Sequence, residues 1–397
     1  MSRSTLLIAA AAGAASLLAT PAAAVASTFS LNKTYDASNF LSEFSWSTPP
    51  SGVGGYLEYV SQGAAMQKNV TEVRDGSLFL RVQSNNSPRD PTNYAARIVS
   101  KQAWGDGAYV VNVSHVPSAC WSRPTLQTIA NKPDDQVQDG TLINIIQNGN
   151  EASPGNVVTL RASNCLIPTQ IPSQLSSSTV INGNCTWLGQ GYFTNGDGCE
   201  VGMGTDPPTW GQGLNANGGG IYAMVRDMSP NGSGISVWYF KQGSEPADLK
   251  LGSNSMEPIK WGTPAVHMDV ASTCKTELGS HNIVFDMSIG IDVNVGYKDG
   301  ISPGNSSCFV GTQNLSALEY YVATARFPEA YWQVNNIRVF TPSKYSNSTA
   351  SGSGNGGNSG NSAGNGGEKT GTASLSFRFQ PVLLTTLALL GAAAALI

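Results

Sequence analysis

The sequence GIYAMVRDMSPNGSGISVWYFK, from Gly220 to Lys241, most clearly predicts the architecture of the chain. Two runs rich in β-branched and aromatic residues, Ile221 to Arg226 and Ile235 to Phe240, flank the turn-forming segment Ser229 to Gly234. Such runs are typical of strands, and Pro, Asn and Gly between them favour a reversal of the chain. The stretch therefore predicts an antiparallel β-hairpin.

Similar runs recur along the chain, bounded by Gly, Pro, Asn and Ser. They are Ser77 to Val82, Gly107 to Ser114, Thr141 to Gln147, Val157 to Arg161, Gly219 to Arg226, Ile235 to Lys241, Ala265 to Val270, Asn282 to Ser288 and Trp332 to Phe340. One segment with helical spacing, Ser316 to Val322, predicts a short helix near the C-terminal end of the domain. Many strands without βαβ alternation favour an all-β fold of two stacked antiparallel sheets.

Both ends of the 397-residue chain carry targeting patterns. Residues 1–26 have a basic start, an apolar run and the small residues Ala24-Val25-Ala26, which predicts a signal peptide. Residues 343–367 are mostly Ser, Gly, Asn, Thr and Ala and predict a flexible stalk. Residues 368–397 combine a polar spacer with an apolar tail, which predicts a GPI-anchor signal that is removed; a retained transmembrane helix is the alternative. Residues 27–342 then form one large β domain.

These patterns predict an extracellular protein at the cell surface or cell wall, held to the plasma membrane by a glycolipid anchor. Asn-x-Ser/Thr sequons fit passage through a secretory pathway; they begin at Asn32, Asn69, Asn85, Asn112, Asn184, Asn231, Asn305, Asn314 and Asn347. The six cysteines favour three disulfides in an oxidising compartment. Fifteen connectivities are possible, and the local pairs Cys165–Cys199 and Cys274–Cys308 are the working hypothesis.

Composition limits the partners that the domain can bind. Only 12% of the residues are charged and the net charge is -4, so no basic stripe exists to hold nucleic acid. His115, His267 and His281 have no metal-ligand spacing, and no loop cradles phosphate, so we expect neither a metal nor another cofactor. A monomer that binds a neutral polymer is the better match.

Several motifs, in order along the chain, resemble the fungal laminarinase-like branch of glycoside hydrolase family 16. They are Asn217 to Met224, Trp238 to Phe240 with Pro246 to Asp248, Trp261 to Pro264, His281 to Asp286, and Glu329 to Trp332 with Asn335 to Ile337. The resemblance spans nearly the whole of residues 27–342. It implies a concanavalin-like β-jelly-roll sandwich with a long cleft for β-1,3- or mixed-linkage β-glucan.

The family carries the pattern Glu-x-Asp-x-x-Glu on one strand, where a bulge turns all three carboxylates into the cleft. Laid on this chain, the pattern falls on Leu142, Asn144 and Gln147. A retaining glycosidase needs two carboxyl groups roughly 5–5.5 Å apart. Leu142 has no lone pair to attack an anomeric carbon, and Gln147 has no dissociable proton to give a leaving oxygen. No catalytic residue of the family pattern is intact.

Other positions that line the cleft in the family also differ here. A family Trp-Pro-Ala-x-Trp segment corresponds to Trp121 to Gln127, so its aromatic places fall on Arg123 and Gln127, with Trp121 displaced. The family's Thr-Leu-His is Thr159-Leu160-Arg161.

These differences leave a set of candidate sugar-binding residues. Trp121 and Trp210 could stack on sugar rings, and Asn144, Gln147 and Gln127 could bind hydroxyls through their amides. Plain polar strand residues are the alternative for the amides, and solvated side chains are the alternative for Arg123 and Arg161.

Two functions follow from these residues. The first is a non-catalytic, surface-anchored member of the family that binds β-glucan or serves the cell wall structurally. The second is an active endo-β-1,3(4)-glucanase or transglycosylase that uses displaced acids, with Asp139 and Glu151 the candidates beside the motif strand. The demand for a closely spaced carboxyl pair favours the first.

Overall fold

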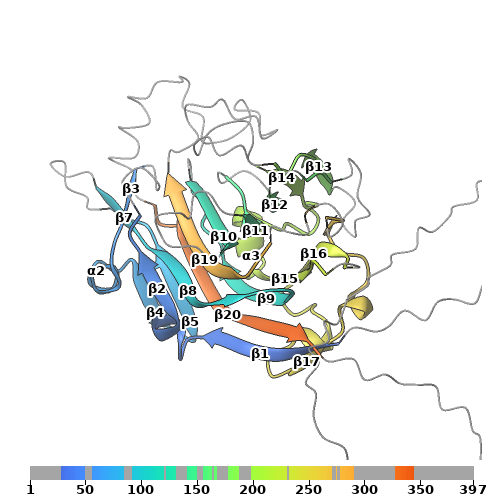
Figure 1. Cartoon of the computed structure of the whole chain (residues 1–397). Helices are drawn as coiled ribbons and strands as arrows, with labels where there is room; N and C mark the ends of the chain where they lie inside the picture. The colour runs from blue at the N-terminus through green and yellow to red at the C-terminus, as the bar shows by residue number, and fades with distance from the viewer. Residues whose placement is uncertain are drawn as a thin grey trace, which may run out of the picture.

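Two large antiparallel sheets, stacked on one another, and a small third sheet make up the chain in a computed structural model (Figure 1). The structure describes residues 28–49, 56–84, 92–119, 122–130, 141–149, 155–162, 165–167, 178–186, 198–229, 232–270, 274, 278–289 and 327–343. The predicted all-β sandwich of two antiparallel sheets is confirmed. The helix predicted at Ser316 to Val322 lies outside the described residues.

The first sheet has nine strands in the order β17-β1-β20-β9-β15-β16-β18, with β5 also paired to β20 and β4 to β5. Their bounds are β1 (Phe29–Asp36), β4 (Thr71–Arg74), β5 (Ser77–Arg81), β9 (Gly107–His115), β15 (Gly220–Asp227), β16 (Gly234–Lys241), β17 (Ser255–Met256), β18 (Val266–Met268) and β20 (Tyr331–Pro342).

The second sheet has eight strands in the order β13-β14-β12-β11-β10-β19-β8-β2. Their bounds are β2 (Phe44–Ser47), β8 (Arg97–Trp104), β10 (Ser122–Ala130), β11 (Leu142–Gln147), β12 (Val157–Arg161), β13 (Thr179–Asn182), β14 (Cys199–Gly202) and β19 (His281–Ile289). A three-stranded sheet joins β3 (Leu57–Tyr59), β7 (Asn93–Ala95) and β6 (Gln83–Ser84).

Helices in the described residues are short. They are α1 (Phe40–Glu43), α2 (Gln62–Gln67), α3 (Gly211–Ala216) and the 3-10 turns η2 (Ala247–Leu249) and η3 (Pro258–Trp261). Within the described part of the chain, none is both long and apolar enough to cross a membrane.

The hairpin predicted between Gly220 and Lys241 is formed by β15 and β16. Their register runs without a shift from Gly220 opposite Lys241 to Asp227 opposite Gly234. Gly234 has a φ of 85°, and a Cβ there would lie 2.2 Å from the Met268 carbonyl oxygen. Glycine therefore lets β18 approach the beginning of β16 closely.

The main hydrophobic core lies between the two large sheets. Phe285 of β19 packs edge-on against Trp332 of β20, with ring centroids 5.5 Å apart, and joins the two layers. Phe44 lies against the same Phe285 ring, and all three side chains are fully buried. Burying an aromatic side chain of this size stabilises the fold by about 1.5–3 kcal/mol. The edge-on geometry adds about 0.5–1.5 kcal/mol for each aromatic pair.

The first and last described strands are neighbours. β1 pairs with β20 from Phe29 opposite Pro342 to Asp36 opposite Asn336. The backbone N–H of Ser343 donates to the Thr28 carbonyl at 2.8 Å. Both ends of the described domain therefore leave from one corner of the nine-stranded sheet (Figure 1).

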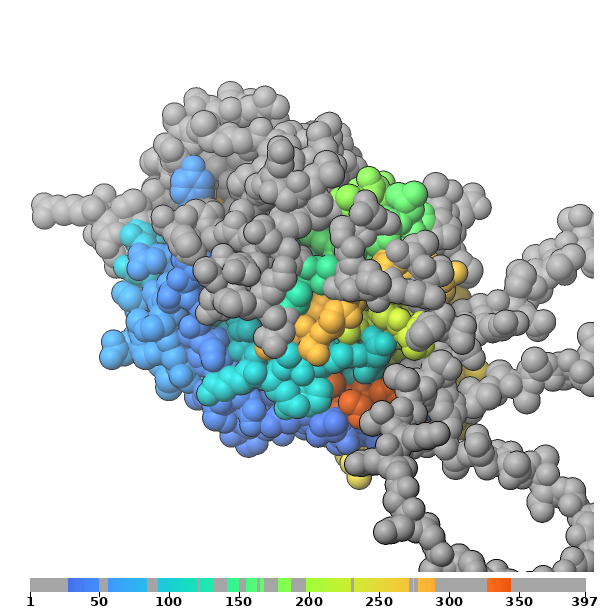
Figure 2. Space-filling model, in the orientation of Figure 1, coloured from blue at the N-terminus to red at the C-terminus, as the bar shows by residue number. Residues whose placement is uncertain are grey.

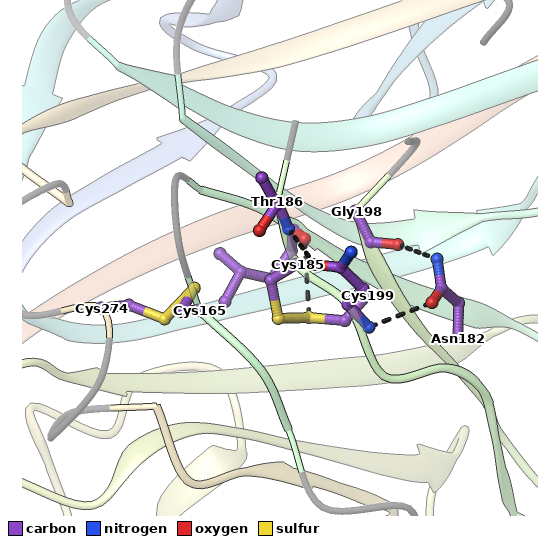
Figure 3. The surroundings of a disulfide bond; sticks show 9 residues. Cys165, Asn182, Cys185, Thr186, Gly198, Cys199 and Cys274 are labelled. Carbon is purple, nitrogen blue, oxygen red and sulfur yellow. Dashed lines mark hydrogen bonds between the residues drawn. A yellow bond between two sulfur atoms is a disulfide. The ribbon is translucent and has the colours of Figure 1, made fainter. Parts of the chain in front are cut away.

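The disulfides correct the pairs expected from the sequence. Cys165 is bonded to Cys274, 109 residues away, and Cys185 is bonded to Cys199, 14 residues away (Figure 3). The hypothesised pairs Cys165–Cys199 and Cys274–Cys308 are therefore wrong. The β12–β14 pairing sets Leu160 opposite Cys199, and the bridge of Ala162 with Thr186 brings Cys185 to the same place. Sheet topology, rather than distance along the chain, decides the connectivity.

His281, the first residue of β19, is fully buried and uncharged. Its Nδ1 lies 3.0 Å from the Thr128 hydroxyl, and its Nε2 lies 3.1 Å from the Thr141 hydroxyl. Burial, followed by the charge of Arg226, lowers the pKa of His281 to about 3. The folded state therefore binds no proton at His281 under mildly acidic conditions in which the unfolded chain does.

We predict that removing the Cys165–Cys274 bond costs more stability than removing Cys185–Cys199. Loop-closure entropy stabilises by about 4.7 kcal/mol for a loop of roughly 100 residues and by about 3 kcal/mol for one of roughly 15. Urea unfolding of the Cys165→Ser/Cys274→Ser and Cys185→Ser/Cys199→Ser variants measures the difference. A larger loss in the second variant would contradict the assigned loops.

We also predict that His281 makes the protein less stable in acid. Because its folded pKa lies below that of the unfolded chain, the free energy of unfolding should fall by about 2 kcal/mol between pH 7 and pH 5 on account of this group. The comparison is with His281→Asn, which keeps a polar group near Thr128 but does not titrate. Equal pH dependence of urea unfolding in both proteins would rule out this contribution.

Candidate functional site

The eight-stranded sheet has one face in the core and one facing away from the nine-stranded sheet, here called the outer face. Leu126, Ile143 and Leu160 belong to the main core, so the residues that alternate with them point to the outer face. In Figure 2, atoms of β19 (orange) lie at the surface beside atoms of the 92–119 segment (teal).

A β-bulge places all three positions of the family pattern on the outer face. Leu142 lies opposite Ile129 of β10, and Asn144 lies opposite Gln127. The register then shifts by one residue, so that Gln147 lies opposite Thr125. Without the shift, Gln147 would point into the core, because side chains alternate along a strand. The arrangement is the one that the spacing of the pattern predicts.

Asn156 holds the bulged end of β11. It is fully buried, and its Nδ2 donates to the Ile145 carbonyl at 2.9 Å. The backbone N–H of Gln147 donates to Asn156 Oδ1 at 2.8 Å. One side chain thus pairs two backbone groups on either side of Ile146 and orients Gln147. The motif spacing gives no sign of this positioning residue, which lies on the loop before β12.

Leu142 is part of a small apolar cluster on the outer face. It packs with Ile129 of β10 and Val284 of β19, and with the partly buried Val99 of β8. Only 8% of Leu142 is exposed. The first position of the family pattern is therefore filled by a packed side chain with no group able to react.

Asn144 and Gln147 form an amide pair beside this cluster. Asn144 Nδ2 donates to Gln147 Oε1, and each residue is 4% exposed. Asn144 Oδ1 is buried and has no hydrogen-bond partner. Because amides both donate and accept, the pair can bind an uncharged hydroxyl group.

Two hydroxyl groups flank the amide pair. Thr125 lies opposite Gln147 on β10, and Thr159 lies opposite Asn144 on β12. Both hydroxyl oxygens are buried without a hydrogen-bond partner. Buried polar groups are normally paired, so these three oxygens are hydrogen-bonding groups that the described residues leave without a partner. Thr159 belongs to the segment that matches the family's Thr-Leu-His, but neither Thr159 nor Thr125 is among the predicted sugar-binding residues.

The other candidate residues lie around this cluster or away from it. Arg161 of β12 lies opposite Leu142, and Arg123 of β10 lies opposite Ser288. The two arginines are therefore at opposite ends of the group formed by Leu142, Asn144 and Gln147. Trp121 lies outside the described residues. Trp210 is a correction: it precedes α3, belongs to the main core and is 1% exposed, so its ring cannot stack on a sugar here.

Two acidic residues stand on the described strands of the outer face, Glu200 and Asp286. Glu200 of β14 lies opposite Thr159 and is 7% exposed. Asp286 of β19 lies opposite Thr125; its Oδ1 accepts from the Tyr59 hydroxyl and its Oδ2 lies 3.3 Å from Arg97 Nε. Asp139 and Glu151, the acids considered as substitutes, lie outside the described residues.

The separation of the two acids decides what they can do. β14 and β19 are four strand spacings apart in the sheet order, which is on the order of 19 Å at about 4.8 Å a spacing. Retention needs carboxyl groups about 5–5.5 Å apart and inversion about 6.5–9.5 Å. Glu200 and Asp286 therefore cannot act as a glycosidase pair. Among the described residues, no three His, Cys, Asp or Glu side chains are placed to hold a metal ion.

Known proteins share this arrangement of sheets. The structure of laminarinase 16A from Phanerochaete chrysosporium with 6-O-glucosyl-laminaritriose in its donor and acceptor sites superimposes with a TM-score of 0.63 at 27% identity. The match covers 79% of this chain and all of that one. A mutant laminarinase 16A that cyclizes laminariheptaose gives a TM-score of 0.64 at 27% identity, with the same coverage.

Curated relatives agree with the structural match. A probable endo-1,3(4)-beta-glucanase of Aspergillus niger is 27% identical over 362 residues, which is 89% of this chain and 45% of that protein. The endo-1,3(4)-beta-glucanase xgeA of Emericella nidulans is 26% identical over 79% of this chain and 48% of its own length. The chain thus spans about half the length of these relatives. The family model described as "XgeA-like, catalytic GH16 domain" matches residues 44–340, and the chain belongs to glycoside hydrolase family 16.

Proposed function

We propose that this chain is a secreted, cell-surface member of the family that binds β-glucan without cleaving it. The observation that carries the proposal is the composition of the outer face at the motif strand: Leu142 is packed into an apolar cluster, and Asn144 and Gln147 are bonded to one another. Neither the attacking group nor the proton donor of a retaining glycosidase is available at these positions.

Binding is supported by the polar groups that remain. Asn144, Thr125 and Thr159 each bring a buried, unpaired oxygen to the same part of the outer face. Amide and hydroxyl groups carry no net charge and suit the hydroxyls of a neutral sugar. The relative from Phanerochaete chrysosporium holds β-glucans in its donor and acceptor sites, and β-glucan is therefore the proposed ligand.

The location is proposed from the sequence outside the described domain. A signal-peptide pattern precedes the domain, and a Ser/Gly/Asn-rich stalk and a GPI-anchor pattern follow it. Such a tether would hold a monomeric glucan-binding domain at the plasma membrane, where it can contact cell-wall polysaccharide.

We predict that the purified secreted chain binds laminarin and releases no reducing ends from it. The variant Asn144→Ala/Gln147→Ala should bind at least about tenfold more weakly, since each lost hydrogen bond is worth about 0.5–1.5 kcal/mol. Isothermal titration calorimetry measures binding, and a reducing-end assay measures cleavage. Leu251→Ser is the matched control, because Leu251 is 74% exposed and lies near β17 on the other sheet.

Two results would contradict the proposal. The first is the release of reducing ends that is lost on heating and is lowered by Asp139→Asn or Glu151→Gln, which would support the active enzyme with displaced acids. The second is the absence of laminarin binding by a folded chain, which would leave only a structural role in the wall.

We predict further that Leu142 matters for stability and not for chemistry. Leu142→Ala should lower the free energy of unfolding by about 2–3 kcal/mol through loss of packing against Ile129 and Val284. Leu142→Met, which keeps the volume, should cost less than about 1.5 kcal/mol. Urea unfolding tests both, and equal stability of the alanine variant and the unmodified chain would show that the cluster is not packed as described.

A further inference from the structure

Four of the sequons lie in the described residues, and their surroundings differ. Asn32 and Asn69 are exposed. Asn112 is half-buried on β9, a central strand, and its Oδ1 accepts from Asn335 Nδ2 at 2.8 Å. Asn184 is exposed beside the β13 edge of the eight-stranded sheet. A sugar can be accommodated only where the asparagine side chain reaches solvent. Asn184 is therefore a better attachment site for a sugar than Asn112.

The Asn184 side chain is held in a defined position. The backbone N–H of Thr186 donates to Asn184 Oδ1 at 3.0 Å, so the carboxamide oxygen faces the backbone and the planar amide turns its nitrogen away. The N–H of Asn184 in turn donates to Asn182 Oδ1 at 3.0 Å. Thr186, the third residue of the sequon, is thereby brought next to the carboxamide.

The disulfide fixes this sequon to the sheet. Its middle residue, Cys185, is bonded to Cys199 of β14. Asn182 Nδ2 donates to the carbonyl of Gly198, the residue before Cys199, at 2.8 Å (Figure 3). A group attached to Asn184 would therefore sit over a fixed part of the surface.

An exposed apolar side chain lies where such a group would rest. Leu166 is directly opposite Asn184 in an isolated antiparallel bridge, and 63% of Leu166 is exposed. Residues directly opposite one another have Cβ atoms about 4.5–5.5 Å apart, which is the reach of one sugar ring. Ile181 of β13, also exposed at 42%, is a second apolar side chain on this edge of the sheet.

We infer that Asn184 is an N-glycan acceptor and that the first sugar ring of the glycan packs on Leu166. This inference rests on the passage through the secretory pathway proposed above. The donor is an oligosaccharide linked to a lipid diphosphate. Asn184 Nδ2 attacks the anomeric carbon, an N–C bond forms, and the bond from that carbon to the diphosphate oxygen breaks. The lipid diphosphate leaves with the electron pair, and Nδ2 loses one proton.

The experiment uses the full chain secreted from a eukaryotic host. Peptide mass spectrometry after enzymatic removal of N-glycans in heavy-oxygen water should show label at residue 184 and none at residue 112. Asn184→Gln should remove one glycan-sized step in mobility, and Thr186→Ser should keep it. Sugar at Asn32 or Asn69 with none at Asn184 overturns the inference and leaves secretion intact, whereas a chain without sugar at any sequon contradicts the secretory premise as well.

Packing on Leu166 is tested by a double-mutant cycle. In the glycosylated chain that keeps Leu166, Asn184→Gln should lower the Tm by about 2 °C. In a Leu166→Ser background, where the apolar contact is absent, the same substitution should leave the Tm unchanged. Asn112→Gln serves as the control for glycan occupancy, which it should not change. The same fall in Tm in both backgrounds would show that the sugar does not contact Leu166.

Discussion

The two-residue periodicity of β11, interrupted once at its bulge, governs which side chains the domain presents on its outer face. On one side of the interruption, Ile143 packs between the sheets while Leu142 and Asn144 face outward; beyond it, Gln147 returns to the same outer face. Asn156 stabilises the interruption through hydrogen bonds to the backbone on both sides. The sandwich framework of the family is therefore kept, and the strand presents an aliphatic side chain and two amides at these three outward positions.

Neutral side chains at these positions also remove an electrostatic penalty. Three carboxylates on one strand repel each other, and keeping them ionised in a largely buried site is unfavourable. Here Leu142 adds to an apolar cluster, and the two amides satisfy each other in part. Exchange of catalytic groups for packed or paired ones commonly raises stability at the expense of activity.

The sequence predicted the sandwich because β-branched and aromatic runs mark most of its central strands, including β12 and the β15–β16 hairpin. It did not predict β10, because Pro124 interrupts the pattern; the structure tolerates this proline where β10 pairs with β19 and the pairing with β11 has not begun. The outward orientation of Leu142, Asn144 and Gln147 followed from their spacing. Asn156 and the partners of Cys165 and Cys185 are brought in by long-range topology and have no local signal in the sequence. The burial of Trp210 has none either.

The pairing of the first and last strands has a mechanical consequence. A pull on the backbone beyond Ser343 is directed along β20, whose ladders with β1 and β9 run parallel to the load. Many hydrogen bonds must then yield together instead of opening one after another, as they would if the strand were peeled from its end. In the tethered, glucan-binding protein proposed above, this pairing would carry tension between the C-terminus and a polymer bound on the opposite layer.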